Sequence, residues 1–151
     1  MTDTSPLAKK PVCQVGFVVR NIDEAAATLS RLLDIPKPNV IVTDTPDKAK
    51  TVYRGAPTRA RAKLAFFQIG DLSLELIEPF DGPSTWQEFL DKHGSGIHHI
   101  AFQIQGTDRA IAWLQDEGAK MVQQGHYTGG MYTYVEGPKS LPAVLELLER
   151  L

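Results

Sequence analysis

The same order of predicted strands and helices occurs twice in this chain of 151 residues. Aligned with itself at an offset of 85 residues, the segment VGFVVRNIDEAAATL (15–29) falls on IAFQIQGTDRAIAWL (100–114). At an offset of 71 residues, LELIE (74–78) falls on LELLE (145–149), with four of the five residues identical. Both matches come in the same order and at the same structural positions, so together they indicate a duplicated domain.

Each half begins with a strand and a helix and continues with several strands, which predicts an α+β fold. The strand-like runs are rich in β-branched and aromatic residues, and Gly70-Asp71 separates two of them as a hairpin. A capping box of Ser84 and Gln87 begins a helix that links the halves. The predicted strands are 12–20, 62–69, 72–79, 96–104, 120–127, 131–136 and 143–149, and the predicted helices are 22–33, 84–93 and 107–118, the last with Thr107 as its N-cap.

Composition and charge exclude several classes of protein. Hydrophobic residues make up 42% and charged residues 23%, as in an ordinary globular domain. Sixteen basic against 18 acidic residues give no global field for nucleic acid or an anionic membrane. The single cysteine, Cys13, excludes an internal disulfide and a multi-cysteine zinc site. No apolar run approaches the ~20 residues of a membrane span, and the N-terminus lacks the apolar core of a signal peptide. We therefore expect a flexible tail over 1–10 and one cytoplasmic domain over 11–151.

Four polar side chains occupy equivalent positions in the two halves, inside runs where apolar residues would be expected. Gln14 corresponds to His99, and Glu75 corresponds to Glu146. Strand alternation places all four on the face away from the helices, so they meet in one cavity if the halves curl toward each other. Two carboxylates, an imidazole and an amide suit a divalent ion such as Mn, Co, Ni, Fe or Zn, which can polarise a substrate oxygen.

Each of these residues also has an ordinary interpretation. A single glutamate on an antiparallel strand most often faces solvent, and Gln14 alone would be a hydrogen-bonded amide. Of the two adjacent histidines, alternation places His98 on the core face with Ile100, as a hydrogen-bonded core residue, and leaves His99 as the site residue. Only the pairing of all four across the duplication favours a metal site.

These residues lie within motifs that resemble the vicinal oxygen chelate superfamily, also called glyoxalase/bleomycin resistance/dioxygenase. The resemblance covers essentially the whole chain after the tail and includes GIHHIAF (96–102) with a downstream LEL. Within the superfamily, four segments are most similar to methylmalonyl-CoA epimerases. They are LELIEPFDGPSTWQEFLDKHGSGIHHIAFQI, TGG (128–130), PKS (138–140) and VLEL (144–147).

The resemblance implies two βαβββ modules, at about 11–80 and about 96–151, joined by the helix 84–93. Their curved mixed sheets would surround a central cavity, with the helices on the outside, and such folds are often homodimers. The family ligands fall on Gln14, Glu75, His99 and Glu146. Epimerases have histidine at the first of these positions, whereas glyoxalase I enzymes of the human type have glutamine there with Glu, His and Glu elsewhere.

The implied chemistry is removal of a proton next to a (thio)ester or carbonyl group, with Glu146 as both metal ligand and base. Epimerases use a second glutamate base, but residues 48–62 contain no acid. The expected substrate is a small molecule, and the epimerase resemblance favours an acyl-CoA. Further substrate-binding candidates are Tyr53, Tyr132 and Tyr134, which would shape the pocket or donate a proton, and Arg54 and Lys139, which would contact a phosphate or carboxylate.

Two alternatives come from the same superfamily. One is a glutathione-dependent lactoylglutathione lyase, which the glutamine at position 14 fits. The other is a metal-free ligand-binding or resistance protein, a class whose members tend to lack the ligands that this chain keeps. Pro138-Lys139-Ser140 and the adjacent histidines favour the epimerase over the lyase.

Overall fold

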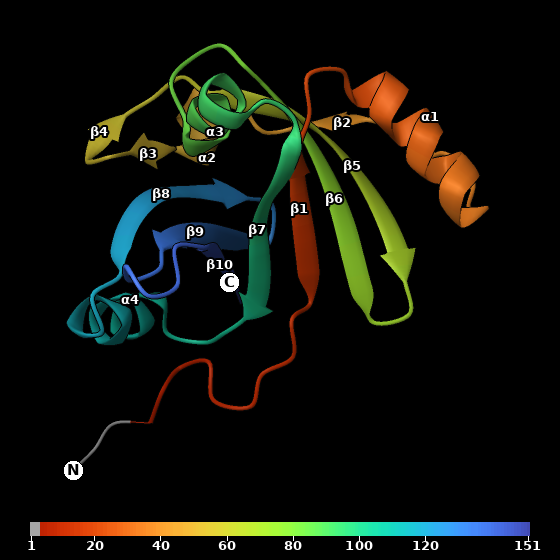
Figure 1. The fold of residues 1–151 in the computed structure, drawn as a ribbon. Helices are drawn as coiled ribbons and strands as arrows, with labels where there is room; N and C mark the ends of the chain where they lie inside the picture. The colour runs from red at the N-terminus through yellow and green to blue at the C-terminus, as the bar shows by residue number, and fades with distance from the viewer. Residues whose placement is uncertain (1–3) are drawn as a thin grey trace.

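The computed structural model describes residues 4–151, in which ten strands form one continuous, strongly curved sheet (Figure 1). The elements, in chain order, are β1 (Gln14–Val18), α1 (Ile22–Leu33), β2 (Ile41–Val42), α2 (Pro46–Ala49), β3 (Val52–Tyr53), β4 (Ala56–Pro57), β5 (Arg61–Ile69), β6 (Leu72–Phe80), α3 (Thr85–His93), β7 (Gly96–Gln103), α4 (Thr107–Asp116), β8 (Lys120–Tyr127), β9 (Gly130–Glu136) and β10 (Val144–Arg150). Their order across the sheet is β2-β5-β6-β1-β7-β10-β9-β8-β3-β4.

The strand register shows the duplication directly. Read outward from the centre, β1-β6-β5-β2 and β7-β10-β9-β8 have the same order, and in each half the first two strands are parallel. Gly16 pairs with Glu75, and Ala101 pairs with Glu146, so the 85- and 71-residue offsets of the sequence map one pair onto the other. The α+β prediction of two βαβββ modules is confirmed. Antiparallel pairing of β1 with β7 joins both modules within one chain.

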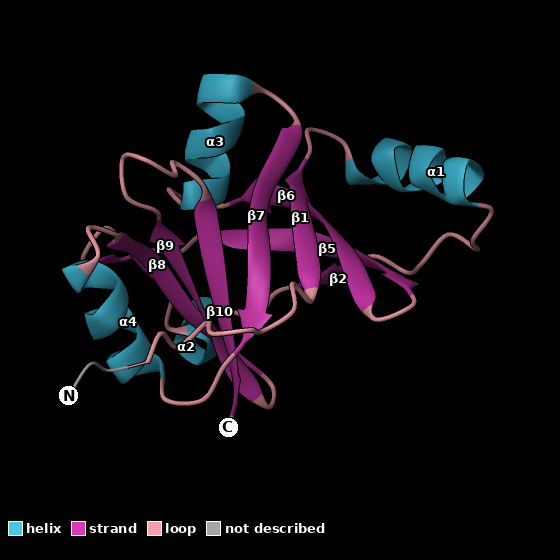
Figure 2. Ribbon diagram, turned by 60° about the horizontal axis from the view of Figure 1, so that its bottom comes forward, coloured by secondary structure: helices cyan, strands magenta, loops and turns pink. Residues whose placement is uncertain are grey.

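Helices α1 and α4 cover the outer face of the sheet, one beside each module (Figures 1 and 2). Ile22 and Ala26 of α1 pack in one apolar cluster with Phe67 and Leu76. A corresponding cluster under α4 contains Ala110, Leu114, Val135 and Leu147. Because successive strand residues point to opposite faces, the residues between these outer apolar ones face the inside of the curve.

The linking helix α3 packs differently, since it contributes to the inner cluster. Trp86 and Leu90 of this helix pack with Val18, Ile77 and Tyr134. The side chain of Ser84 accepts a hydrogen bond from the backbone N–H of Gln87, as the capping box predicts. This packing fixes the start of α3 close to the centre of the sheet.

The start of α4 corrects the prediction that Thr107 is its N-cap. Gly106 holds that position with φ 78°, and no side chain of its own caps the helix. Instead the Glu149 carboxylate of β10 accepts from the backbone N–H groups of Gly106 (2.7 Å) and Thr107 (3.1 Å). A carboxylate distant in sequence therefore satisfies the first N–H groups of the helix.

The stretch between β2 and β5 leaves its own module and crosses to the far edge of the other. We call residues 43–60 the strap. Within it, β3 pairs antiparallel with β8, with Val52 opposite Gln124, and β4 forms the last strand of the sheet. The strap therefore connects the first module to the open edge of the second.

Part of the predicted tail contacts the body of the protein. Residues 1–3 lie outside the described part of the chain, whereas the backbone of 5–10 is held by turn hydrogen bonds. Leu7 packs against the apolar cluster under α4. No helix in residues 4–151 is long and apolar enough to cross a membrane.

Candidate metal centre

The four predicted ligands lie on the four central strands of the sheet. Glu75 is on β6, Gln14 on β1, His99 on β7 and Glu146 on β10, and all four side chains are buried. The Nε2 atom of His99 is 2.8 Å from Oε2 of Glu146, 3.2 Å from Oε1 of Gln14 and 3.5 Å from Oε1 of Glu75. Each module thus supplies two of the four side chains, which meet around a single imidazole nitrogen.

Gly16 makes room for this imidazole. It lies opposite His99 across the β1–β7 pair. A Cβ atom at position 16 would lie 2.0 Å from Cε1 of His99 and 2.5 Å from its Nε2, both far inside van der Waals contact. The His99 ring therefore occupies the place of a side chain at position 16.

Two carboxylate oxygens at the centre contact His99 without a hydrogen bond of ordinary geometry. Oε1 of Glu75 and Oε2 of Glu146 are buried, and neither makes a hydrogen bond of ordinary geometry. Burying unpaired carboxylate oxygens is costly unless a cation or donor reaches them. One donor atom each from Glu75, His99 and Glu146 lies within 4.8 Å of the others, which is a spacing that a metal ion can bridge. The donor set and the unpaired oxygens fit a divalent ion.

The same crowding shifts two pKa values in the metal-free protein. Burial, followed by repulsion from Glu146, raises the pKa of Glu75 above its ordinary value, although His99 acts in the opposite direction. Burial, the largest single effect, lowers the pKa of His99, but the charge of Glu146, its close contact with the ring and the charge of Glu75 together outweigh burial and raise that pKa. The centre thus carries excess negative potential that favours a cation.

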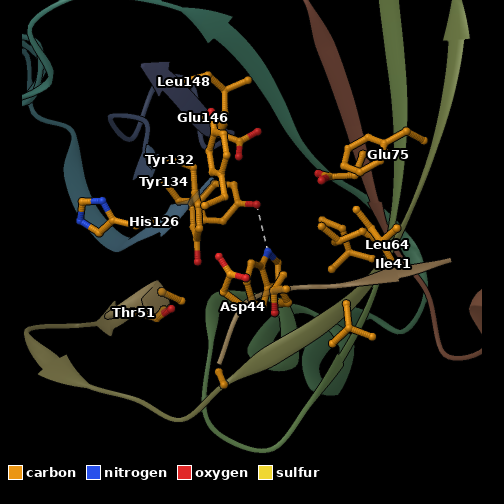
Figure 3. Close-up of a pocket in the computed structure, with 18 of the residues that line it drawn as sticks. Ile41, Asp44, Thr51, Leu64, Glu75, His126, Tyr132, Tyr134, Glu146 and Leu148 are labelled. Atoms are coloured by element: carbon orange, nitrogen blue, oxygen red, sulfur yellow. Dashed lines mark hydrogen bonds between the residues drawn. The ribbon is translucent and has the colours of Figure 1, made fainter. Parts of the chain in front are cut away.

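A cavity of about 510 Å³ opens from these side chains (Figure 3). Glu75 faces it from one side, with Glu146, Tyr132 and Tyr134 on the other. Burial raises the pKa of both tyrosines above the ordinary range, so their hydroxyls stay protonated. The Tyr134 hydroxyl accepts from Nε1 of Trp86 at 3.0 Å. The structure therefore places both predicted tyrosines of β9 in the cavity wall.

Three other predicted substrate-binding residues lie outside the cavity lining. Arg54 donates to Glu88 of α3 (2.9 Å) and to Glu136 of β9 (3.1 Å), and the Tyr53 hydroxyl donates to the same Glu88 carboxylate. Lys139 is exposed in the turn before β10. Among residues 4–151, those that line the cavity include no lysine or arginine. A substrate role for Tyr53, Arg54 and Lys139 stays a prediction.

Two residues near the centre were not assigned to it from the sequence. Asp44, from the strap, lines the cavity and is the only acid besides Glu75 and Glu146 among the described lining residues (Figure 3). It falls just before the acid-free stretch 48–62, and no local pattern marks it. The second is His98, which is buried and hydrogen-bonded as predicted, but not on the face that alternation assigns.

A β-bulge explains the position of His98. Along the β1–β7 pair, Gly16 is opposite His99 and Phe17 is opposite Ile97, which leaves His98 as an extra residue. The His98 ring therefore turns toward the same side as its neighbour. The two Nδ1 atoms are 2.9 Å apart, and the two rings have their centroids 5.2 Å apart.

Comparison with known proteins places this site in a family. Residues 13–135 match the model of the Glyoxalase/Bleomycin resistance protein/Dioxygenase superfamily. The chain belongs to this superfamily. Its members generally bind divalent metals, in agreement with the donor set of Glu75, His99 and Glu146.

Within the superfamily, the chain is similar to several proteins. It is 38% identical over 64 residues to the uncharacterized protein YqjC of Bacillus subtilis, a match that spans 42% of this chain and 46% of that one. It is 29% identical over 128 residues to the mitochondrial methylmalonyl-CoA epimerase of Dictyostelium discoideum, over 83% of this chain and 73% of that one. The crystal structure of methylmalonyl-CoA epimerase from Mycobacterium tuberculosis superimposes with a TM-score of 0.67 at 21% identity, covering 100% of this chain and 93% of the other.

Proposed function

We propose that the protein is a divalent-metal-dependent epimerase or isomerase that removes a proton next to a carbonyl or thioester group. One observation carries the proposal: Glu75 and Glu146 face one cavity from opposite sides of His99, each with a buried oxygen that makes no hydrogen bond of ordinary geometry. Such oxygens are available both to a metal and to a substrate proton.

A bound divalent ion would supply positive charge that stabilises the negative charge developing on a substrate oxygen. Glu146 would act as ligand and as the base that takes the proton from carbon. Glu75 would return a proton from the other side, because its buried carboxylate faces the same cavity from the opposite wall. This assignment gives the epimerase its second acid–base group, although residues 48–62 contain no acid.

The similarity to methylmalonyl-CoA epimerases makes an acyl-CoA, with methylmalonyl-CoA as the first example, the substrate to test. The largely apolar and aromatic walls of the cavity, from residues such as Leu64, Ile77 and Trp86, would exclude water from the reacting carbon.

A lactoylglutathione lyase of the glyoxalase I type is the second candidate. The observation that favours it is the identity of the four side chains. The amide oxygen of Gln14 contacts Nε2 of His99 beside two glutamates, which is the Gln, Glu, His and Glu set of the glyoxalase I enzymes of the human type. Both candidates begin with removal of a carbon-bound proton, so they differ in the substrate that the cavity accepts rather than in the base.

The first experiment combines metal analysis with proton exchange. Protein purified without chelator should contain about one divalent ion per chain, and the loaded protein in D₂O should exchange the α-proton of methylmalonyl-CoA. Glu146→Gln should abolish the exchange. Glu149→Gln is the matched control on the same strand, because Glu149 caps α4 outside the cavity and glutamine keeps one oxygen that can accept from the start of the helix.

The outcomes separate the alternatives. Exchange of methylmalonyl-CoA supports the epimerase, whereas turnover only of methylglyoxal with glutathione replaces it by the lyase. Absence of bound metal, even after reconstitution, would overturn both and leave a ligand-binding protein of the same fold. Activity in Glu146→Gln would show that another residue is the base.

A further inference from the structure

His98 is a buried histidine that the proposed chemistry does not use. Both of its ring nitrogens have partners: Nδ1 is 2.9 Å from Nδ1 of His99, and Nε2 is 3.2 Å from the hydroxyl of Thr85. The ring also packs edge-on against Phe89 of α3 and against Tyr134 of β9. These contacts leave His98 a single orientation between the linking helix and the ligand cluster.

The contact between the two Nδ1 atoms requires one of them to donate and the other to accept. If His99 is to bind a cation through Nε2, the atom that faces Gln14, Glu75 and Glu146, its proton must be on Nδ1. Nδ1 of His98 then accepts that proton, and Nε2–H of His98 donates to the Thr85 hydroxyl. Each hydrogen bond in the chain thereby has one donor and one acceptor.

The chain of hydrogen bonds continues to the cavity wall. The backbone N–H of Thr85, the first residue of α3, donates to Oε1 of Gln123 at 2.9 Å. The side-chain amide of Gln123 in turn donates to the Tyr132 hydroxyl at 3.0 Å. Thr85 and Gln123 are both buried, so water does not compete for these bonds.

We propose that His98 is a positioning residue for the metal centre: it accepts the Nδ1 proton of His99 and so directs the Nε2 lone pair of His99 toward the two glutamates. The bulge in β7 allows the contact between the Nδ1 atoms of His98 and His99, because a regular strand would turn His98 to the other face of the sheet. Thr85 fixes His98 in turn, so the helix that links the modules sets the orientation of a ligand. The proposal rests on the proposed metal at His99.

The test measures divalent zinc affinity by competition with a chelator and the His99 tautomer by ring ¹⁵N NMR of the zinc-loaded protein. His98→Leu should weaken zinc binding by about tenfold to a hundredfold, the usual effect of removing a partner of a ligating histidine. His98→Asn should restore most of the affinity, because its Oδ1 takes the place of Nδ1 as acceptor. His93→Leu, which removes an exposed histidine of α3, is the control and should bind as the wild type does.

A second variant keeps the proposal testable if His98→Leu does not fold. Thr85→Val preserves the shape of the side chain but removes the hydroxyl, and it should weaken zinc binding and broaden or shift the His98 ring signals. Wild-type affinity in folded His98→Leu or Thr85→Val, or a His99 ring that carries its proton on Nε2 when loaded, would overturn the inference. If the wild type does not bind zinc, the same competition is run with Co²⁺, and failure to bind either ion would instead contradict the proposed function.

Discussion

At position 16, the absence of a side chain provides the space for the His99 ring. The His99 ring lies so close to Gly16 that a Cβ atom there would be 2.0 Å from the ring. Gly16→Ala must therefore displace the ring from Gln14 and both glutamates. We expect its affinity for zinc to fall at least tenfold, as chelator competition would measure, because ligand geometry limits metal affinity.

Gly96→Ala is the matched control for this substitution. Gly96 belongs to the same β1–β7 pair, but a Cβ atom there would meet Phe89 at 3.5 Å, an ordinary contact. It should bind zinc like the wild type. If Gly16→Ala also binds like the wild type while folded, His99 is not the ligand that the geometry suggests.

At this scale, strand alternation was enough to predict where Gln14, Glu75 and Glu146 point, because each lies in a regular stretch of strand. It failed for His98, since a bulge depends on the partner strand and leaves no mark in the local pattern. The contribution of Glu149 to the cap of α4 could not be predicted for a similar reason, because Glu149 and Thr107 are 42 residues apart in the sequence.

Among the elements, one carboxylate links the strap to helix α3. Glu88 of α3 accepts from Tyr53 and Arg54 of the strap and from Lys92 one helical turn away. Partial burial alone would raise the pKa of Glu88, but these donors outweigh it and lower that pKa to about 2. Because the folded pKa lies below the unfolded value, the charged carboxylate stabilises the fold above about pH 4.5, and this contribution is lost as the pH falls toward 2.

Glu88→Gln should therefore lower the free energy of unfolding by about 1 kcal/mol at pH 7, a modest value because the group is partly exposed to solvent. The difference from the wild type should shrink below pH 4.5 in urea unfolding curves. Asp91→Asn, on the same helix, controls for the loss of a carboxylate, and its side chain accepts only a neutral donor from Gln87. A difference that is equal at pH 7 and pH 3 would contradict this assignment.

The longer elements were predictable from sequence, and the strap was not. Strands such as β5 and β6 have nine residues each, enough for alternation and a turn signal to show. By contrast, β2, β3 and β4 have two residues each, and β3 pairs with a strand of the other module. A two-residue strand has no periodicity, so its partner follows only from the closed fold.

For the whole molecule, the candidate metal centre lies where the two duplicated modules meet. The β1–β7 pair joins the modules, and the proposed ligand set takes Gln14 and Glu75 from one module and His99 and Glu146 from the other. A cation bound there would connect both halves of the sheet. Without a cation, burial and repulsion between the two carboxylates oppose that junction, and His99 offsets only part of this cost, since the pKa of Glu75 stays raised.

Metal binding should therefore stabilise both modules together. At a free metal concentration of about 100 times Kd, the free energy of unfolding should rise by about 2.7 kcal/mol in a single transition. Amide hydrogen exchange should slow in β6 and β1 as much as in β7 and β10, since the ion can dissociate only when a ligand from either side moves away. Glu146→Gln provides the control, because it removes one ligand and should abolish the added protection in all four strands. Protection confined to β7 and β10 would mean that Gln14 and Glu75 do not hold the ion, and the centre would then belong to one module alone.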